Sequence, residues 1–226
     1  MTEIDPQALR ARLIATCRAM NAQGINQGTS GNASARDRHP DHGDGLWVTP
    51  TGMPYDALAP EDLPFIAFAD AQSHGRRAPS SEWRFHYDIL RARPDQEAVI
   101  HAHSSFATAL SCHGRDLPAF HYMVAVGGGE DIRCAPYALF GTQALSDHAL
   151  TALEARKACL LAHHGVICLG ASPEKALGLL IEVETLCGTY LRALQIGEPP
   201  LLSAAQMEAV IAKFQTYGRQ PDQKDE

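Results

Sequence analysis

Hydrophobic residues recur along the chain with the two periods that distinguish helices from strands. In residues 6–22 they form a stripe with helical spacing, which predicts an amphipathic helix. Capping residues and apolar runs predict four further helices, at residues 80–93, 104–112, 143–156 and 173–196, with Ser80 or Ser81 as the cap of the first. A capping box of Ser203 and Gln206 predicts a last helix that extends to about Tyr217.

Short apolar segments between these helices predict strands. They lie at residues 33–37, 45–48, 65–70, 97–104 and 158–170. Strands and helices interleave, but their connections are short and irregular, which favours helices covering a mixed sheet over regular parallel β-α-β units. We therefore expect a single α/β domain over residues 1–218, followed by a polar tail at residues 219–226.

Composition narrows the class of protein. The 226 residues are 45% hydrophobic and 20% charged, which is ordinary for a soluble globular protein. A formal net charge of -7 argues against non-specific binding to nucleic acid, so an anionic substrate has to be held by local donors. The sequence shows no signal peptide, no run of transmembrane length and no CxxC pair among its six cysteines, which favours a cytoplasmic protein with reduced thiols and no membrane partner.

Two histidines stand one residue apart at the end of an apolar strand, in the stretch EAVIHAHS. Side chains at positions i and i+2 of a strand share one face, so His101 and His103 point to one place. The stretch LLAHHGV offers a third imidazole, because adjacent residues of a strand face opposite sides and either His163 or His164 can join. Three histidines with an open fourth position are typical of a catalytic zinc site, although such histidines also occur as ordinary core or surface residues.

Polar groups suited to catalysis and to phosphate binding lie in other loops. Glu82 stands in the first turn of a predicted helix, where it can reach a metal or a substrate carbon, or can simply favour the helix dipole. The clusters GTSGN (28–32), TPTG (49–52) and PSSE (79–82) offer hydroxyl and backbone N–H groups that bind phosphate. Each cluster alone is equally typical of a turn or a cap, but together they predict a phosphate site without basic side chains.

Eight motifs follow one another in the order found in the class II aldolase/adducin family. They are GINQGTSGNAS, VTPTGMPYDAL, PSSEWRFHYDI, AVIHAHS, PAFHYMVAVGGG, APYALFGT, LLAHHGV and KFQTYG. The chain resembles this family over about residues 8–218, and within it the aldolases that cleave ketose 1-phosphates. The resemblance implies a three-layer α/β/α fold around a mixed, mostly antiparallel sheet, and a homotetramer with active sites between subunits.

The resemblance also implies the metal and its ligands. Zinc would be bound by His101, His103 and His164, which selects His164 over His163. Glu82 would be the catalytic acid and base, and it is a candidate fourth ligand when substrate is absent. A site of three histidines also accepts cobalt or manganese, so the sequence does not choose among these metals.

Further roles are implied for residues around the metal. Tyr122 would donate a proton to the site of a neighbouring subunit, and Phe140 and Tyr217 would line the side of the pocket that takes the aldehyde. The residues implied to bind or shape the phosphate site are Gly28, Thr29, Gly31, Asn32, Thr51, Gly52, Ser80 and Ser81.

The activity implied is cleavage of a ketose 1-phosphate such as L-fuculose 1-phosphate, reversibly, to dihydroxyacetone phosphate and an aldehyde. Two related substrates, 5-deoxyribulose 1-phosphate and 5-methylthioribulose 1-phosphate, differ in the aldehyde released and stay open. An L-ribulose-5-phosphate 4-epimerase is a further alternative, but its usual motif has an aspartate at the position of Glu82. A non-catalytic interaction module like the adducin head is the alternative of another class, and it would be expected to lack the metal ligands.

Overall fold

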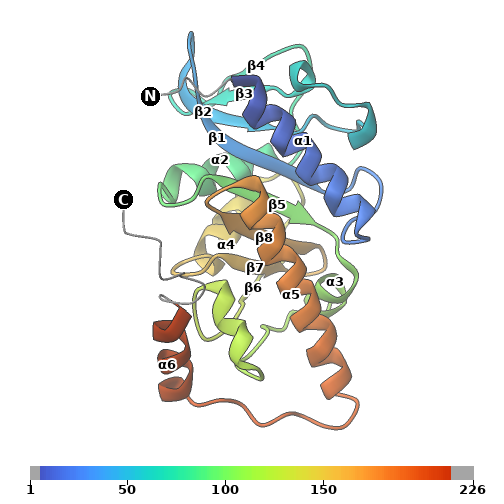
Figure 1. The fold of residues 1–226 in the computed structure, drawn as a ribbon, viewed down its shortest axis with the longest axis vertical. Helices are drawn as coiled ribbons and strands as arrows, with labels where there is room; N and C mark the ends of the chain where they lie inside the picture. Colours follow the sequence, from blue (N-terminus) through green and yellow to red (C-terminus); the bar gives the residue numbers. More distant parts are fainter. Residues whose placement is uncertain (1–5, 215–226) are drawn as a thin grey trace, which may run out of the picture.

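The computed structural model describes residues 6–214, which form one sheet with helices on both faces (Figure 1). The strands are β1 (Asn32–His39), β2 (Gly43–Val48), β3 (Phe65–Ala67), β4 (Ser73–His74), β5 (Ala98–Ala102), β6 (Cys134–Ala135), β7 (Ala158–Leu161) and β8 (Gly165–Gly170). The α-helices are α1 (Pro6–Ala22), α2 (Trp83–Ala92), α3 (Ser105–Ser111), α4 (Gln143–Ala152), α5 (Pro173–Ala193) and α6 (Ala204–Phe214). Short 3-10 helices are η1 (Tyr55–Ala57), η2 (Pro60–Asp62) and η3 (Tyr122–Gly127).

Within residues 6–214 the sheet has eight strands in the order β4-β3-β2-β1-β5-β8-β7-β6. Each pair of neighbours is antiparallel except β6 with β7, which run parallel. The predicted α/β class with a mixed, mostly antiparallel sheet is therefore confirmed. Strand β5, which carries His101, lies inside the sheet between β1 and β8.

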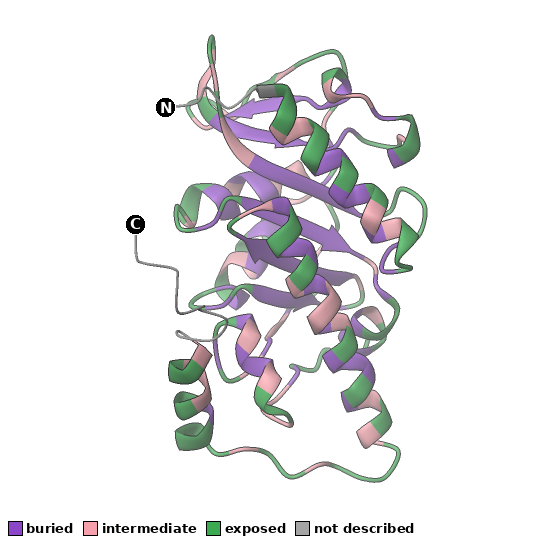
Figure 2. Ribbon diagram, viewed as in Figure 1, coloured by how far each residue is buried: buried purple, intermediate pink, exposed green. Residues whose placement is uncertain are grey.

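Alternation along β5 sends its side chains into two hydrophobic clusters on opposite faces of the sheet. Ile100 packs in the cluster that includes residues of α1, α3 and α5, and Val99 packs in the cluster that includes residues of α2 and α4. The sheet thus has a helical layer on each face, as the resemblance implied, and Figure 2 shows its strands buried beneath helices whose outer sides are exposed. His101 is two residues after Val99 in β5, so its side chain leaves the same face of the sheet. Its ring therefore lies on the α2 face, edge-on to the ring of Phe85.

Most of the predicted elements form close to their predicted limits. Helix α5 begins at its cap Ser172, whose hydroxyl accepts a hydrogen bond from the Lys175 backbone N–H. The capping box before α6 is confirmed, because the Ser203 N–H donates to Gln206 Oε1 and the Gln206 N–H donates to Ser203 Oγ. The predicted end of this helix near Tyr217 lies outside the described residues, and the domain limits 1–218 stay a prediction.

Two sequence-based expectations about local structure were wrong, and the two-residue strands β4 and β6 were missed. Residues 158–170 are a hairpin of β7 and β8 rather than one strand, because both strands are buried and their unbroken apolar pattern hides the turn. The two-residue strand β6 was not predicted, since so short a segment carries no periodic signal. Helix α2 has Glu82 itself as its N-cap residue rather than a serine, and Glu82 makes no side-chain cap hydrogen bond.

No helix in the described part of the chain is long and apolar enough to cross a membrane. All six cysteines are free thiols, and four of them are buried in the interior, as expected for small apolar side chains.

Candidate active site

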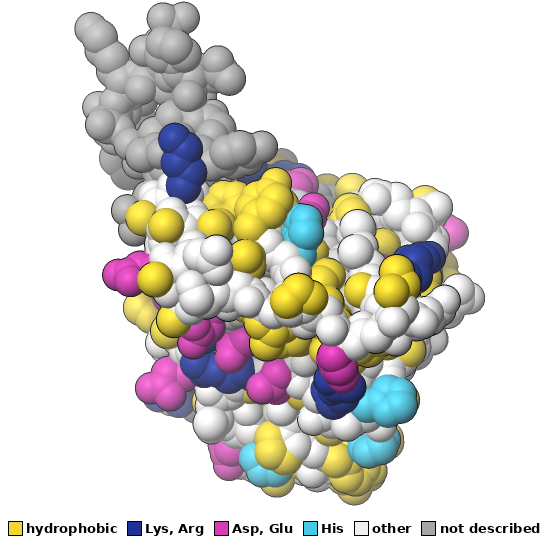
Figure 3. All heavy atoms as spheres, turned by 90° about the horizontal axis from the view of Figure 1, so that it is seen from below, with side chains coloured by type: hydrophobic (Ala, Val, Ile, Leu, Met, Phe, Trp, Pro, Cys, Tyr) yellow, Lys and Arg dark blue, Asp and Glu magenta, His cyan; other side chains and the backbone are white. Residues whose placement is uncertain are grey.

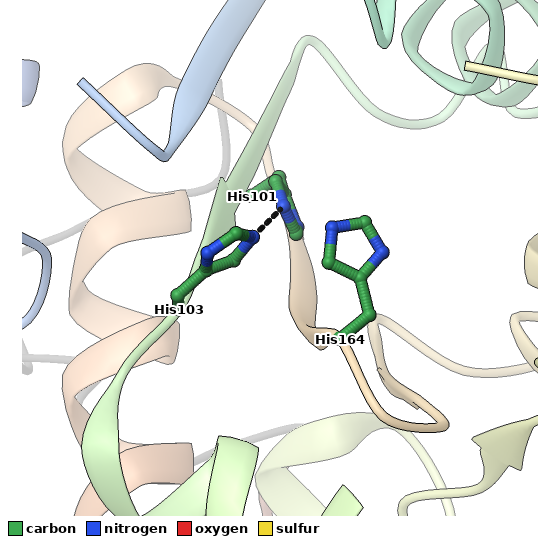
Figure 4. A group of neighbouring side chains, drawn as sticks. All are labelled: His101, His103 and His164. Atoms are coloured by element: carbon green, nitrogen blue, oxygen red, sulfur yellow. Dashed lines mark hydrogen bonds between the residues drawn. The ribbon is translucent and has the colours of Figure 1, made fainter. Parts of the chain in front are cut away.

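Three histidine side chains converge at the end of strand β5. His101 is in the strand, His103 follows its last residue, and His164 lies in the turn between β7 and β8. Strand β8 pairs with β5 so that Val166 is opposite Ala102, which brings this turn beside the end of β5. One ring nitrogen from each histidine lies within 4.8 Å of the others, and Figure 4 shows the three rings turned toward one another.

The arrangement of the three rings suits a divalent cation. His101 Nδ1 is 3.0 Å from the carbonyl oxygen of Val166, to which it donates, and this leaves its Nε2 as an acceptor facing the cluster. Burial lowers the pKa of each of the three imidazoles, that of His101 most strongly, so they remain neutral at neutral pH. Neutral imidazole is the form that binds a metal.

His163 and His164 both lie in the turn between β7 and β8 rather than on the two faces of one strand. His163 has a φ of 57°, in the left-handed region, and its backbone N–H donates to the carbonyl oxygen of Ser111. One of these two histidines does join the cluster, as expected. The reason we expected, alternation of side chains along a strand, is wrong, because both residues lie in a turn. The cluster contains His164, while His163 lines the pocket beside it.

Glu82 is a buried carboxylate in contact with this cluster. Its Oε2 is 3.4 Å from His101 Nε2 and accepts a hydrogen bond of 2.9 Å from Asn32 Nδ2, and its Oε1 is 3.3 Å from His164 Nε2. Among residues 6–214 nothing donates a hydrogen bond to Oε1, although that atom is fully buried. Burial raises the pKa of the Glu82 carboxyl, and His164 and then the Asn32 hydrogen bond oppose that shift.

Together these groups fit a divalent metal ion. Three imidazole nitrogens and one carboxylate oxygen with no other partner form a set of nitrogen and oxygen donors directed at one region. A buried acceptor without a partner costs free energy unless a cation or a ligand satisfies it.

A pocket of about 470 Å³ opens beside the cluster. Its described lining consists of Thr29, Ser30, Thr51, Gly52, Ser81, Glu82, His103, Tyr137, Ala138, Phe140, His163 and His164. Gly52 has a φ of 68°, a conformation that other residues rarely adopt. Residues implied for phosphate, for the aldehyde side and for the metal therefore share one cavity.

Comparison with known proteins identifies the family. The model of the class II aldolase and adducin N-terminal domain matches residues 11–191 of this chain. The chain belongs to the class II aldolase and adducin family. Its relatives include a 5-methylthioribulose-1-phosphate/5-deoxyribulose-1-phosphate aldolase of Rhodospirillum rubrum, 53% identical over 211 residues that cover 93% of each chain.

Other relatives and a solved structure agree with this assignment. An L-fuculose phosphate aldolase of Escherichia coli K12 is 47% identical over 216 residues, covering 95% of this chain and 98% of the relative. The structure of an L-fuculose 1-phosphate aldolase matches with a TM-score of 0.88 and 34% identity, covering 95% of this chain and 100% of that one. These matches identify the chain as a class II aldolase, a lyase.

Several residues implied for the aldolase site are not among the described lining residues of the pocket. Asn32 and Ser80 are two of these, and both are buried. Ser80 Oγ accepts from the Glu82 backbone N–H at 3.3 Å. Gly31 is held so close to β5 that a Cβ there would lie 2.7 Å from the carbonyl oxygen of His101. Gly28 has a φ of 59°, which suits the loop it shapes.

Of the residues implied for the aldolase site, Tyr122 is not among the described lining of this pocket. It lies in η3 and is 50% exposed. Tyr217 lies outside the described residues. Phe140 does line the pocket, with 59% of its surface exposed.

The sequence analysis missed His86, which hydrogen-bonds to Asn32, and Tyr137, which lines the pocket. A signal for His86 was present, because residues four apart on a helix lie on the same side and His86 is four residues after Glu82. For Tyr137 we find no comparable signal, since it lies in an irregular segment before α4.

Proposed function

We propose that this class II aldolase depends on zinc and cleaves a ketose 1-phosphate reversibly to dihydroxyacetone phosphate and an aldehyde. The observation that carries the proposal is one pocket that holds a buried carboxylate, two histidines of the metal cluster and several hydroxyl groups suited to phosphate. The relatives named above act on phosphorylated sugars of this kind, as their names state.

The metal would be held by His101, His103 and His164, with Glu82 as a further ligand when substrate is absent. A divalent cation bound there supplies Lewis acidity, which polarises a carbonyl group and stabilises developing negative charge. Three imidazole ligands with an open position favour zinc, while cobalt and manganese also suit such a donor set. No lysine lines the described part of the pocket, so Schiff-base catalysis has no candidate residue among those positions.

The phosphate would be bound by neutral donors. Thr29, Thr51, Gly52 and Ser81 line the pocket and would supply hydroxyl and backbone N–H donors, and its described lining has no arginine. Gly28, Gly31, Asn32 and Ser80 would shape the same loops. Holding the phosphate fixes the position of the reacting carbons relative to Glu82, which lowers the entropic part of the barrier.

Two proton transfers complete the proposed reaction. When the C3–C4 bond breaks, its electron pair stays with C3, and the protonated Glu82 donates its proton to that carbon. The C4 hydroxyl loses its proton as the aldehyde carbonyl forms, and the phenolate form of Tyr122 of the partner subunit would accept it and become the neutral phenol. The raised pKa of Glu82 supports this role, because an acid works best when its pKa is near the working pH.

The aldehyde side of the pocket would decide among substrates. Phe140 and Tyr217 are the implied residues there, and Phe140 presents an exposed aromatic surface in the pocket. The Rhodospirillum rubrum relative is named for 5-methylthioribulose 1-phosphate and 5-deoxyribulose 1-phosphate, whereas the Escherichia coli relative is named for L-fuculose phosphate. We propose that the enzyme accepts substrates from this group of ketose 1-phosphates.

A homotetramer with active sites between subunits is part of the proposal. It is supported by the absence of the exposed Tyr122 from the described lining of its own chain's pocket and by the exposed apolar side chains of the described surface. Figure 3 shows hydrophobic atoms gathered in several patches on one end of the molecule. The cytoplasmic location inferred from the sequence remains a prediction.

A panel assay tests the proposed function. Protein loaded with zinc is given L-fuculose 1-phosphate, 5-deoxyribulose 1-phosphate and 5-methylthioribulose 1-phosphate, and release of dihydroxyacetone phosphate is followed with a coupled dehydrogenase. We expect cleavage of at least one substrate, loss of activity after chelation, and recovery on adding zinc. The unphosphorylated sugars serve as controls and should react far more slowly. Fully metal-loaded, folded protein that cleaves none of the three would contradict the proposal.

A further inference from the structure

A chain of hydrogen bonds runs from Glu82 into the protein interior. Asn32 Nδ2 donates to Glu82 Oε2 at 2.9 Å, and Asn32 Oδ1 lies 2.6 Å from His86 Nε2. His86 Nδ1 lies 2.8 Å from Ser34 Oγ. All four residues are at most 5% exposed, so water does not compete with these contacts.

The secondary structure aligns the four residues in pairs. Asn32 and Ser34 are two apart on β1, so their side chains leave the same face of the strand. Glu82 and His86 are four apart at the start of α2, so they lie one helical turn apart on the same side. The side chains of the helix pair alternate with those of the strand pair. The order along the hydrogen bonds is Glu82, Asn32, His86 and Ser34.

The direction of each hydrogen bond follows from the chemistry of the groups. Burial lowers the pKa of His86 to about 3, so its ring is neutral and carries a single N–H. A carboxylate only accepts, so Asn32 must turn its Nδ2 toward Glu82 and its Oδ1 toward His86. The proton of His86 is therefore on Nε2, and its Nδ1 accepts from the Ser34 hydroxyl. The opposite rotation of the amide would place its oxygen against the carboxylate oxygen.

We propose that His86 is a positioning residue for Glu82, acting through the side-chain amide of Asn32. By donating to Asn32 Oδ1, His86 holds the amide in the one orientation that donates to Glu82 Oε2. That contact anchors one carboxylate oxygen and leaves Oε1 as the oxygen that exchanges protons with the substrate carbon. The inference rests on the proposed acid/base role of Glu82, and it gives the side-chain amide of Asn32 a role toward the carboxylate.

Two substitutions of His86 that differ in one group test this role. Glutamine places an N–H donor near the position of Nε2, whereas methionine has a similar length and no donor. With the zinc-loaded enzyme, His86→Met should lower kcat by about 10- to 100-fold with KM and zinc content little changed. His86→Gln should restore most of the lost rate. His113→Met, at an exposed position, controls for the introduction of a methionine.

The readout closest to Glu82 is hydrogen exchange. Wild-type enzyme in D2O should exchange the reacting C3 hydrogen of dihydroxyacetone phosphate, which NMR follows without any aldehyde. His86→Met should slow this exchange as much as it slows cleavage. If the methionine variant does not fold, Ser34→Ala replaces it. Without the Ser34 hydroxyl, the His86 proton is no longer held on Nε2 and can move to Nδ1. The exchange rate should then fall by about threefold or more.

Three results would overturn the inference. They are a methionine variant that exchanges at the wild-type rate, a glutamine variant as slow as the methionine variant, and a Ser34→Ala enzyme with unchanged exchange. A crystal structure of His86→Met tests the positioning role without any activity measurement. In that structure the 2.9 Å hydrogen bond between Asn32 Nδ2 and Glu82 Oε2 should be lost. Wild-type protein that cleaves no ketose 1-phosphate would reject the proposed function, while that structure would still test the positioning role.

Discussion

At the scale of single residues, Glu82 is notable because its two carboxylate oxygens have different surroundings. Oε2 accepts from Asn32, while Oε1 is buried, lies 3.3 Å from His164 Nε2 and has no hydrogen-bond donor among the described residues. One oxygen is therefore fixed, and the other can accept or donate a proton or contact a metal. A carboxylate in such surroundings combines a defined position with a raised pKa.

Replacing Glu82 by glutamine tests this residue directly. Glu82→Gln keeps the shape of the side chain but removes its ability to exchange a proton, so turnover should fall by about 10²- to 10⁴-fold. Zinc should stay bound through the three histidines, and metal analysis of the purified variant checks this. Glu61→Gln, at an exposed position on η2, is the control and should keep full activity. A Glu82→Gln enzyme with more than about a tenth of the wild-type rate would exclude the acid/base role.

The convergence of the three histidines was easier to predict from the sequence than the contacts around them. His101 and His103 could be placed together because strand periodicity is a local property. The contact of Asn32 with Glu82 joins residues 50 positions apart, and nothing in either local pattern reports such a contact. The resemblance implies a place for Asn32 at the phosphate, which stays a prediction, and it gave no sign that the side-chain amide contacts Glu82 and His86.

At the scale of elements, helix α3 begins immediately after the metal cluster and is capped from another helix. Its N-cap residue Ser104 makes no side-chain cap hydrogen bond. Glu184 of α5 instead accepts from the backbone N–H groups of Phe106, at 2.8 Å, and Ala107, at 2.9 Å. A carboxylate at this position also interacts favourably with the helix dipole. This contact links α5 to the segment that follows His103.

Removing the Glu184 carboxylate should destabilise the protein. Glu184→Ala leaves two backbone N–H groups without their acceptor, at a cost of about 1 to 2 kcal/mol in the free energy of unfolding. Glu182→Ala, on the same helix and at similar exposure, should change stability by less than about 0.5 kcal/mol. Urea denaturation followed by circular dichroism measures both variants. Equal stabilities of the two variants would show that the cap contributes nothing.

A second element, η2, should make stability depend on pH. The Arg77 side chain and then the Ala59 backbone N–H hold the pKa of Asp62 below its usual value. The stabilisation is therefore present above the unfolded pKa of about 3.9 and is lost as the pH falls through the folded value. The difference in unfolding free energy between wild type and Asp62→Asn should be constant near neutral pH and shrink below pH of about 4. Urea denaturation across this range checks it, and a difference that grows on acidification would contradict the assignment.

Helices and strands could be predicted from the sequence where the capping residues and the spacing of hydrophobic residues were clear. Helices α1 and α5 and the capping box of α6 are local patterns, and each was found from a few neighbouring residues. The β7–β8 hairpin was missed because its turn carries no proline or asparagine and its strands are apolar throughout. Its position depends on pairing with β5, about 60 residues earlier, which lies beyond any local signal.

At the scale of the whole molecule, the described surface carries large apolar side chains that one chain leaves exposed. They are Phe106, Tyr122, Tyr137, Leu139, Phe140, Ile196 and Leu201. Two of these, Ile196 and Leu201, lie in the connection between α5 and α6 at the lower end of Figure 1. Exposed apolar surface of this kind is typical of contacts between subunits.

Mixing two inactive variants tests whether the site is shared between subunits. Tyr122→Phe and Glu82→Gln subunits, unfolded and reassembled together, should regain activity, because some sites then combine Glu82 of one subunit with Tyr122 of the other. In a random equal mixture of a cyclic assembly, roughly one quarter of the sites would be complete. Each variant reassembled alone is the control. A mixture no more active than the controls would place both groups in one subunit and reject the shared site.

The three clustered histidines come from strand β5, from the residue that follows its end, and from the turn between β7 and β8. The cluster therefore exists only in the folded chain, and an ion that binds it shifts the folding equilibrium by mass action. Each tenfold rise in free ion concentration above the dissociation constant adds about 1.4 kcal/mol to the free energy of unfolding. The supply of metal to the cell would then govern how long this protein survives proteolysis as well as how fast it works.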